Sequence, residues 1–459
     1  MTPQTIAATT IDQRLDELIE EQEALLVARQ PRSRELSARA RASLAGGVTS
    51  SWQITRPQAM WIHHGVGSKI IDADGIEYVD LHGGYGVSAV GHVHPAIVEA
   101  VSRRVREGTH FAQPTEDAFI VSEELARRWG LPLWRFANSG TEATMDAVHL
   151  MRAITGRKLI VKIEGCYHGH HDSVQVSVYP SEEQIGSPTH PNSAASSSGI
   201  PSEITDLTLI VQYNDLESLA AILAEHPGEI AGMILEPVMM NAGIVMPDDG
   251  YLAGLIDIVH GNGGLVAFDE VKTGFTVAAG GATEFFGIRP DIVCLAKALG
   301  GGLPVAAIGG TAEVMERVVD GTYEQVGTFN GNPLGMAAAR AALTEVLTPQ
   351  AYRRFDRLRE FIVEGCETAI TAAGLPAHVV AIGAKGCVTF TASPVRNFRD
   401  FLELDERYSH CHWLFQHNGG VFLPPWGKAE QWLLSAQHNE ADAELFVANF
   451  SRFVAALTG

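Results

Sequence analysis

The chain has 459 residues, 46% of them hydrophobic, and is long enough for one large core with smaller lobes. Its 33 basic and 54 acidic residues give a formal net charge of −21, which argues against nucleic-acid or anionic-membrane binding. No uninterrupted apolar run has the length of a membrane span. Five scattered cysteines without a CxxC pair predict reduced thiols and a cytoplasmic location.

The N-terminal part predicts helices and short strands. Residues 11–29 have apolar positions at helical spacing, which predicts an amphipathic leader helix within a segment 1–32. Residues 58–82 predict short strands around a turn at Asp74-Gly75. We expect residues 33–95 to form the N-terminal part of a small α+β domain.

From about residue 95, helical patterns such as 95–107 and 141–154 alternate with short apolar runs. The runs are 133–137, 158–163, 207–212, 230–235, 264–268 and 291–295. This alternation predicts an α/β fold with a mostly parallel sheet in a large domain, residues 96–345. Residues 346–459 are expected to complete the small domain and to end in a helix at 440–457. The Ser-, Pro- and Gly-rich stretch 180–202 predicts either a disordered insertion or a functional lid.

Polar side chains follow the apolar runs, where ligands of open α/β sheets bind. After 133–137, Ser139, Gly140 and Thr141 stand where a loop becomes a helix, which suggests a phosphate cradle; a simple N-cap is the alternative. After 207–212, Asn214 can donate a hydrogen bond into the same crevice, and Glu236 follows 230–235.

The segment after 158–163, "EGCYHGHHDS", contains a histidine cluster. The spacing of His168, His170 and His171 does not fit a metal shell and no second cluster completes one, so we expect no metal. Tyr167 can instead cover the face of a planar ligand.

A carboxylate and an amine follow the last two runs. Asp269 is costly at the end of a buried strand unless a cation pairs with it. Lys297 stands after a buried strand beside Gly300, Gly301 and Gly302, where a lysine of lowered pKa can attack an aldehyde. A phosphate cradle, an aromatic cover, a carboxylate and an amine together complement pyridoxal 5′-phosphate (PLP).

Longer motifs add a resemblance to a known family. The stretches "NSGTEATMDA", "EGCYHGHHDS", "YNDLESL", "ILEPV", "FDEVKTGF", "GIRPDIVCLAKALGGGLPVAAIGG" and "VGTFNGNPLGMAAA" occur in family order within residues 35–458. The chain resembles the class III aminotransferases of PLP fold type I, most of all the glutamate-1-semialdehyde 2,1-aminomutase branch. The resemblance implies a mostly parallel seven-stranded sheet and a smaller domain built from both terminal segments.

The resemblance also implies residue roles. Lys297 would form the Schiff base with PLP and then act as general base, Asp269 would hold the pyridine nitrogen protonated, and Tyr167 would be the third catalytic residue, stacked on the ring. Val271 would pack on the other ring face, and Asn214 would lie near the ring hydroxyl. Ser139, Gly140 and Thr141 would hold the phosphate, together with Gly327 and Thr328 from the neighbouring subunit of a homodimer. Glu236 is counted among the cofactor-binding residues.

The substrate side departs from the aminomutase pattern. Gln53 replaces a basic residue, Tyr85 a tryptophan, and Lys272 a methionine. The candidate substrate residues are Ser50, Trp52, Tyr85, Phe329 and Glu430, and the aromatic side chains of Trp52, Phe329 and Trp426 suggest a bulkier substrate.

These departures favour an intermolecular aminotransferase acting on an amine or amino acid and a carbonyl acceptor. The alternative is the aminomutase itself. A PLP-binding protein without catalysis is disfavoured by the intact Lys297, Asp269 and Tyr167 set, and a nicotinamide dehydrogenase by the absence of a G-x-G-x-x-G motif after the first strand.

Overall fold

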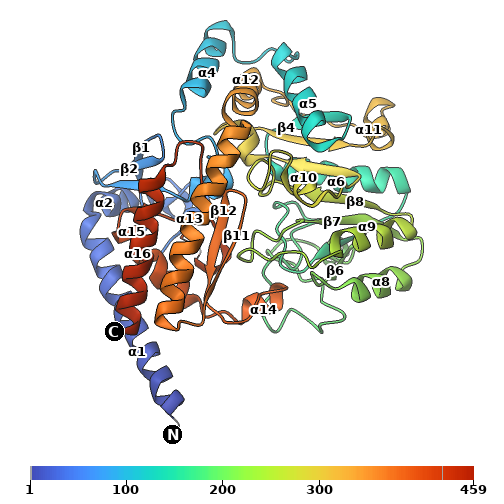
Figure 1. Ribbon diagram of the computed structural model, residues 1–459. Helices are drawn as coiled ribbons and strands as arrows, with labels where there is room; N and C mark the ends of the chain where they lie inside the picture. The colour runs from blue at the N-terminus through green and yellow to red at the C-terminus, as the bar shows by residue number, and fades with distance from the viewer. Residues whose placement is uncertain (1–2, 426) are drawn as a thin grey trace.

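The computed structural model describes residues 3–425 and 427–459, so Trp426 lies outside the described residues. Figure 1 shows the large sheet with helices around it, and the two terminal segments gathered together beside this part of the molecule. No helix among the described residues is long and apolar enough to cross a membrane.

The large sheet has seven strands in the order β4-β10-β9-β8-β7-β5-β6. Only β10 runs antiparallel to its neighbours, so the sheet is mostly parallel, as expected. Its strands are β4 (Leu133–Ala137), β5 (Leu159–Ile163), β6 (Thr208–Val211), β7 (Ile230–Leu235), β8 (Leu265–Asp269), β9 (Ile292–Leu295) and β10 (Ala306–Gly310). The six apolar runs match the first six strands within a residue or so, while β10, made of alanine, isoleucine and glycine, was not among them.

The central strands are covered on both faces. All six residues of β7 and all four of β9 are buried, as parallel strands between two helix layers require. The helices and helical turns that connect the strands or flank the sheet are α4 (Pro95–Glu107), α5 (Glu116–Trp129), α6 (Gly140–Thr155), α7 (Ser202–Thr205), α8 (Leu216–Glu225), α9 (Tyr251–Gly261), α10 (Gly281–Phe286), η3 (Lys297–Gly300), α11 (Ala312–Val319), α12 (Pro333–Ala341) and η4 (Ala342–Val346).

The two ends of the chain fold together. Strand β13 from the C-terminal segment pairs in parallel with β3 from the N-terminal segment, through Val421 and Val79. The N-terminal elements are α1 (Pro3–Arg29), α2 (Pro31–Ala40), η1 (Ala45–Gly47), η2 (Ser51–Gln53), β1 (Ile62–Val66), β2 (Lys69–Asp72), β3 (Glu77–Asp80) and α3 (Gly83–Gly86). The C-terminal elements are α13 (Pro349–Ala373), β11 (His378–Ile382), β12 (Lys385–Thr389), α14 (Phe398–Leu402), α15 (Glu406–Asn418), β13 (Val421–Phe422), η5 (Gly427–Ala429), β14 (Trp432–Leu433) and α16 (Glu440–Thr458).

Helix packing joins the same two segments. Helix α1 packs on α15 and on α16, and α13 packs on α16. The first and last helices therefore lie side by side (Figure 1). Helix α16 begins with a capping box in which Asn439 and Asp442 satisfy each other's backbone N–H groups. The helix expected at residues 440–457 is therefore present with one residue more at its end.

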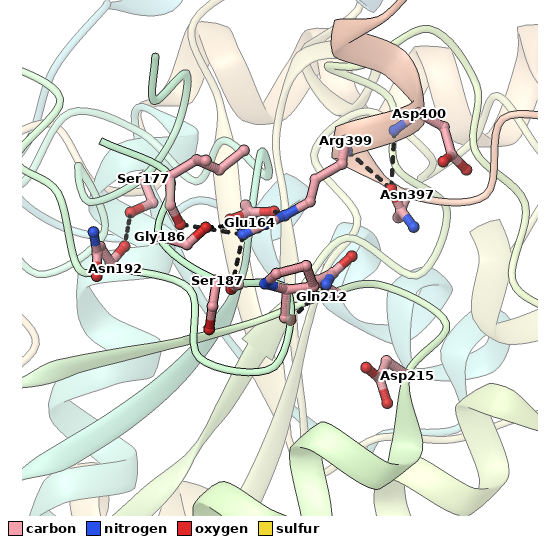
Figure 2. Close-up of polar contacts among 12 residues, drawn as sticks. Glu164, Ser177, Gly186, Ser187, Asn192, Gln212, Asp215, Asn397, Arg399 and Asp400 are labelled. Atoms are coloured by element: carbon pink, nitrogen blue, oxygen red, sulfur yellow. Dashed lines mark hydrogen bonds and ion pairs between the residues drawn. The ribbon is translucent and has the colours of Figure 1, made fainter. Parts of the chain in front are cut away.

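The stretch 180–202 has almost no regular structure, but one arginine holds it. The guanidinium of Arg399, at α14, donates to the backbone carbonyls of Ile185, Gly186 and Ser187 and forms a two-bond ion pair with Glu164 at 2.9 and 3.1 Å. Figure 2 shows this fork between the loop and α14. Through Arg399, the loop is therefore attached to the C-terminal segment as well as to its neighbours in the sequence.

Candidate active site

A cavity of about 400 Å³ opens at the carboxyl edge of the large sheet. Its wall is made of the residues that follow β4, β5, β7, β8 and β9, together with Pro304 and Val305 ahead of β10 and Trp52 and Val87 from the N-terminal segment. The sequence-predicted residues that line it are Trp52, Ser139, Gly140, Thr141, Tyr167, Glu236, Asp269, Val271 and Lys297. Residues far apart in the chain therefore meet in one place, at the sheet edge where ligands of α/β folds bind.

The N-terminus of α6 forms one end of the cavity. Ser139 is the N-cap, and its Oγ donates to Glu142 at 2.8 Å while accepting from the Glu142 N–H. Gly140 has no room for a side chain, because a Cβ there would lie 3.0 Å from Cγ2 of Val271. The free backbone N–H groups and the helix dipole at this end suit a phosphate. The structure shows the N-cap at Ser139, and the same helix N-terminus is compatible with phosphate binding.

Asp269, at the end of β8, is buried and faces the cavity. Its Oδ1 accepts from the backbone N–H of Val271 at 3.0 Å, and its Oδ2 lies 2.8 Å from Nδ1 of His168. These contacts fix the orientation of the carboxylate. A buried carboxylate in this position can hold a protonated ring nitrogen through a charge-assisted hydrogen bond.

Lys297 begins the helical turn η3 with a positive φ of 48°, a conformation that costs energy for any residue other than glycine. Gly301 and Gly302 follow with φ of 56° and 104°, which lets the chain reverse directly after the lysine. Burial, and then the charge of Lys272, lower the pKa of Lys297 from 10.5 to about 8. The amine is therefore partly uncharged near neutral pH and able to act as a nucleophile.

Glu236 organises two other residues of the wall. Its Oε1 accepts from the Tyr167 backbone N–H at 3.0 Å and from the Asn241 side-chain amide at 2.9 Å, and its Oε2 accepts from the Met240 N–H at 2.8 Å. The Tyr167 ring lies 5.2 Å from the Trp52 ring in an edge-on arrangement. Glu236 thus positions an aromatic face and an amide on the same side of the cavity.

Three residues expected at the cofactor do not line this cavity. The side-chain amide of Asn214 donates to the carbonyls of Met246 and Arg396, and its oxygen accepts from the Asp248 N–H, so its polar atoms hold neighbouring backbone. Gly327 and Thr328 are exposed on the surface of this chain. The amide that does line the cavity is that of Asn241.

The candidate substrate residues are scattered. Trp52 lines the cavity, and the Tyr85 hydroxyl donates to the Trp52 carbonyl at 2.9 Å from an adjacent cavity of about 570 Å³. Ser50 is exposed beside η2, and Phe329 is 58% exposed. Glu430 lies behind the wall, where both its oxygens accept from Nζ of Lys272 at 2.9 Å.

Three functional-site residues were not assigned to the site from sequence: His168, Asn241 and Lys272, all of which line the cavity. His168 stood in the motif considered for metal, but its Asp269 contact depends on folding across 101 residues. Asn241 could have been found from the sequence, because it lies five residues after Glu236, which directly follows the end of β7. Among the described residues, no group of three or more His, Cys, Asp or Glu could hold a metal ion.

The geometry combines, at one edge of the sheet, a helix N-terminus that suits a phosphate, a fixed carboxylate and a lysine of lowered pKa. Comparison with known families adds that residues 53–421 match the class III aminotransferase family model. A glutamate-1-semialdehyde 2,1-aminomutase of Sorangium cellulosum is 40% identical over 92% of this chain and 95% of that protein. One from Desulfitobacterium hafniense is 38% identical over 90% of this chain and 95% of that protein.

Solved structures agree with this likeness. The aminomutase of Pseudomonas aeruginosa PAO1 in complex with PMP superposes with a TM-score of 0.88 at 28% identity, covering 97% of this chain and 99% of that one. An omega-transaminase from Sphaerobacter thermophilus superposes with a TM-score of 0.89 at 31% identity, covering 94% and 100%.

The chain belongs to the class III aminotransferase family. The protein is therefore an enzyme of PLP fold type I whose cofactor is PLP, which confirms the expected family, fold class, enzyme class and cofactor. The comparisons favour the expected alternative, the aminomutase, over the intermolecular aminotransferase that was expected first.

Proposed function

We propose that this enzyme is a glutamate-1-semialdehyde 2,1-aminomutase, which moves an amino group between neighbouring carbons of one substrate. The similarity that supports this proposal extends over 92% of this chain and 95% of the Sorangium cellulosum aminomutase. The observation that carries the chemistry is Lys297, an amine of lowered pKa that lines the same cavity of about 400 Å³ as the fixed carboxylate of Asp269.

The cofactor-binding roles follow from the cavity wall. The N-terminus of α6, with Ser139, Gly140 and Thr141, would hold the PLP phosphate, and Asp269 would hold the ring nitrogen. Val271 and Tyr167 would cover the two ring faces, with Glu236 keeping Tyr167 and Asn241 in position. PLP supplies an aldehyde that accepts amino groups and a protonated ring that draws electrons from the bond being broken.

Lys297 has two tasks in this proposal. Its amine would hold the cofactor through the aldehyde that PLP supplies, and when free of the cofactor it would act as the general base that moves a proton at the substrate carbon. Burial supports both tasks, because it keeps part of the amine uncharged and excludes water from the reacting atoms.

The proposal includes a homodimer in which Gly327 and Thr328 reach the phosphate site of the neighbouring subunit. Both residues are exposed, and the apolar side chains of Val326 and Phe329 beside them are 80% and 58% exposed, which would suit burial against a neighbouring subunit. Mixing inactive Lys297→Ala dimers with inactive Thr328→Asp dimers should restore activity, because a hybrid dimer contains one intact site. No restoration after subunit exchange would contradict shared sites. A cytoplasmic location also belongs to the proposal, supported by five buried free thiols.

An intermolecular aminotransferase is the second candidate. Lys272 and Gln53 support it, because they replace residues of the aminomutase pattern on the substrate side of the site. Purified enzyme incubated with glutamate-1-semialdehyde and no added amino donor or acceptor separates the two. The aminomutase produces 5-aminolevulinate under these conditions; conversion that requires an added donor or acceptor would favour the second candidate.

A further inference from the structure

Lys385, in β12, is a buried amine that none of the roles above uses. Its side chain is 1% exposed, and within residues 3–425 and 427–459 no hydrogen bond or ion pair to its Nζ is found. An ammonium group has three donors, and leaving them unpaired away from water is costly. A fold keeps such a group at a functional site when a ligand supplies the missing acceptor.

The position of Lys385 brings it close to the reacting atoms. A methyl group built on Gly86 would lie 3.1 Å from Nζ of Lys385 and 3.6 Å from Cδ of Lys297. The two lysine side chains therefore meet at a residue without a side chain, and the next residue, Val87, lines the cavity. Lys385 itself is not among the residues that line the cavity, but an acceptor group bound by its Nζ would lie near Lys297.

The surrounding charges leave a cation in excess. Nζ of Lys272 is already satisfied by both Glu430 oxygens at 2.9 Å and by the Met240 carbonyl at 2.8 Å. The charged or titratable groups that act on Lys385 are Lys272, Lys297, Glu430, Glu236 and the buried His82. Glu236 is engaged by Tyr167, Met240 and Asn241, so neither carboxylate is available to pair with Lys385.

The opposite wall offers no alternative cation for an anionic substrate. Gln53 stands near Trp52, and its side-chain oxygen accepts from the backbone N–H and the hydroxyl of Thr49 at 3.1 and 2.7 Å. The residues described as lining the cavity include no arginine. Within this chain, the cations at or beside the cavity are therefore Lys272, Lys297 and Lys385.

We propose that Lys385, beside the Lys272–Glu430 ion pair, binds the carboxylate of the substrate and restricts this enzyme to amino and oxo acids. This inference rests on the proposed amino-transfer function and names the substrate class of the same site. It holds for either candidate reaction, since both can act on a carboxylate-bearing substrate.

The probe is levulinate, a five-carbon oxo acid, compared with its uncharged methyl ester. Isothermal titration of the PLP-loaded enzyme measures binding without turnover. We expect Lys385→Met to weaken levulinate binding by about tenfold or more and to leave methyl levulinate binding unchanged. The matched control is Lys69→Met, which removes the same charge from an exposed pair with Glu77 and should bind levulinate as the unmodified enzyme does.

Two further readouts separate a binding role from a structural one. Because burial lowers the pKa of Lys385 to about 7, levulinate binding at pH 8 should take up a proton at this group, seen as buffer-dependent titration enthalpies that Lys385→Met abolishes. The melting temperature of Lys385→Met should be equal or higher, since an unpaired buried charge is removed.

Equal levulinate affinity in Lys385→Met, or equal weakening of acid and ester, would overturn the carboxylate assignment. A failure to form 5-aminolevulinate with the levulinate result intact would overturn the aminomutase proposal alone, so the two failures are distinguishable.

Discussion

The two walls of the cavity are built in different ways. The sheet-edge wall takes its polar groups from strand ends and the start of α6, within continuous motifs, and fixes them by short contacts such as His168 to Asp269 at 2.8 Å. The opposite side is assembled from the terminal segments, with Trp52 in the cavity wall and Glu430 and Lys385 behind it, from positions far apart in the chain. In the proposed function, the sheet edge holds the groups that bind the cofactor, and the terminal segments supply the groups expected to select the substrate.

The largest effect is expected at the sheet-edge wall. Lys297→Ala removes both the attaching amine and the general base, so turnover should fall by at least about 10³-fold. The phosphate cradle and Asp269 should still retain PLP, visible as cofactor absorbance that co-elutes with the protein. The exposed Lys158→Ala variant is the control, and undiminished steady-state turnover in Lys297→Ala would refute the assignment.

A stability effect should dominate on the opposite side. Glu430→Gln leaves Lys272, which is 5% exposed, without its counter-charge, and the free energy of unfolding should fall by about 3–5 kcal/mol. The double variant Glu430→Gln/Lys272→Met should recover most of this loss, because no unpaired charge remains. Urea denaturation of the unmodified enzyme, Glu430→Gln, Lys272→Met and the double variant completes the cycle, and strictly additive losses would show that the pair is not coupled.

The neighbouring carboxylates of Asp269 and Glu270, at the same sheet edge, are expected to have different roles. Asp269→Asn removes the charge that faces the cofactor nitrogen, and we expect a loss of about 10²-fold in turnover with little change in melting temperature. Glu270 faces away and accepts from Trp129, Thr273, Ala282 and Thr283. Glu270→Gln should therefore cost about 1–3 kcal/mol of stability with a smaller effect on rate, measured by denaturation and steady-state assays. The reverse pattern would contradict these roles.

The pH dependence of cofactor capture is the most gradual effect. With the Lys297 pKa at about 8 in the folded apoenzyme, the rate of PLP attachment should fall about tenfold for each unit below pH 8 and level off above it. The unfolded chain keeps this lysine protonated up to 10.5, so folding stability from this group should rise between pH 8 and 10.5. A rate that still rises steeply to pH 10 would contradict the lowered pKa.

The sheet-edge wall could be predicted from sequence because its residues immediately follow apolar strands. Strand position alone located Ser139, Tyr167, Asp269 and Lys297, and the carboxyl ends of parallel strands share one edge. Strand β10 was missed because alanine and glycine carry no strong apolar signal. Asn214 and Asn241 show the limit of this approach: both follow strand ends, and only the folded loops decide which amide faces the cavity.

The opposite side could not be predicted, because its contacts join distant segments. Lys272 and Glu430 are 158 residues apart, and nothing in either local sequence indicates that they pair. The same holds for the loop 180–202, whose attachment to Arg399 spans more than 200 residues. Such pairings follow from the tertiary arrangement of the two terminal segments and not from local propensity.

The central claim is that one lysine among three buried near the cavity attaches to PLP. Borohydride reduction of the loaded enzyme followed by peptide mapping tests this directly. The account predicts that the pyridoxyl group is found on Lys297, with Lys272 and Lys385 unmodified. A label on either of those two lysines, or no label in a fully loaded enzyme, would contradict it.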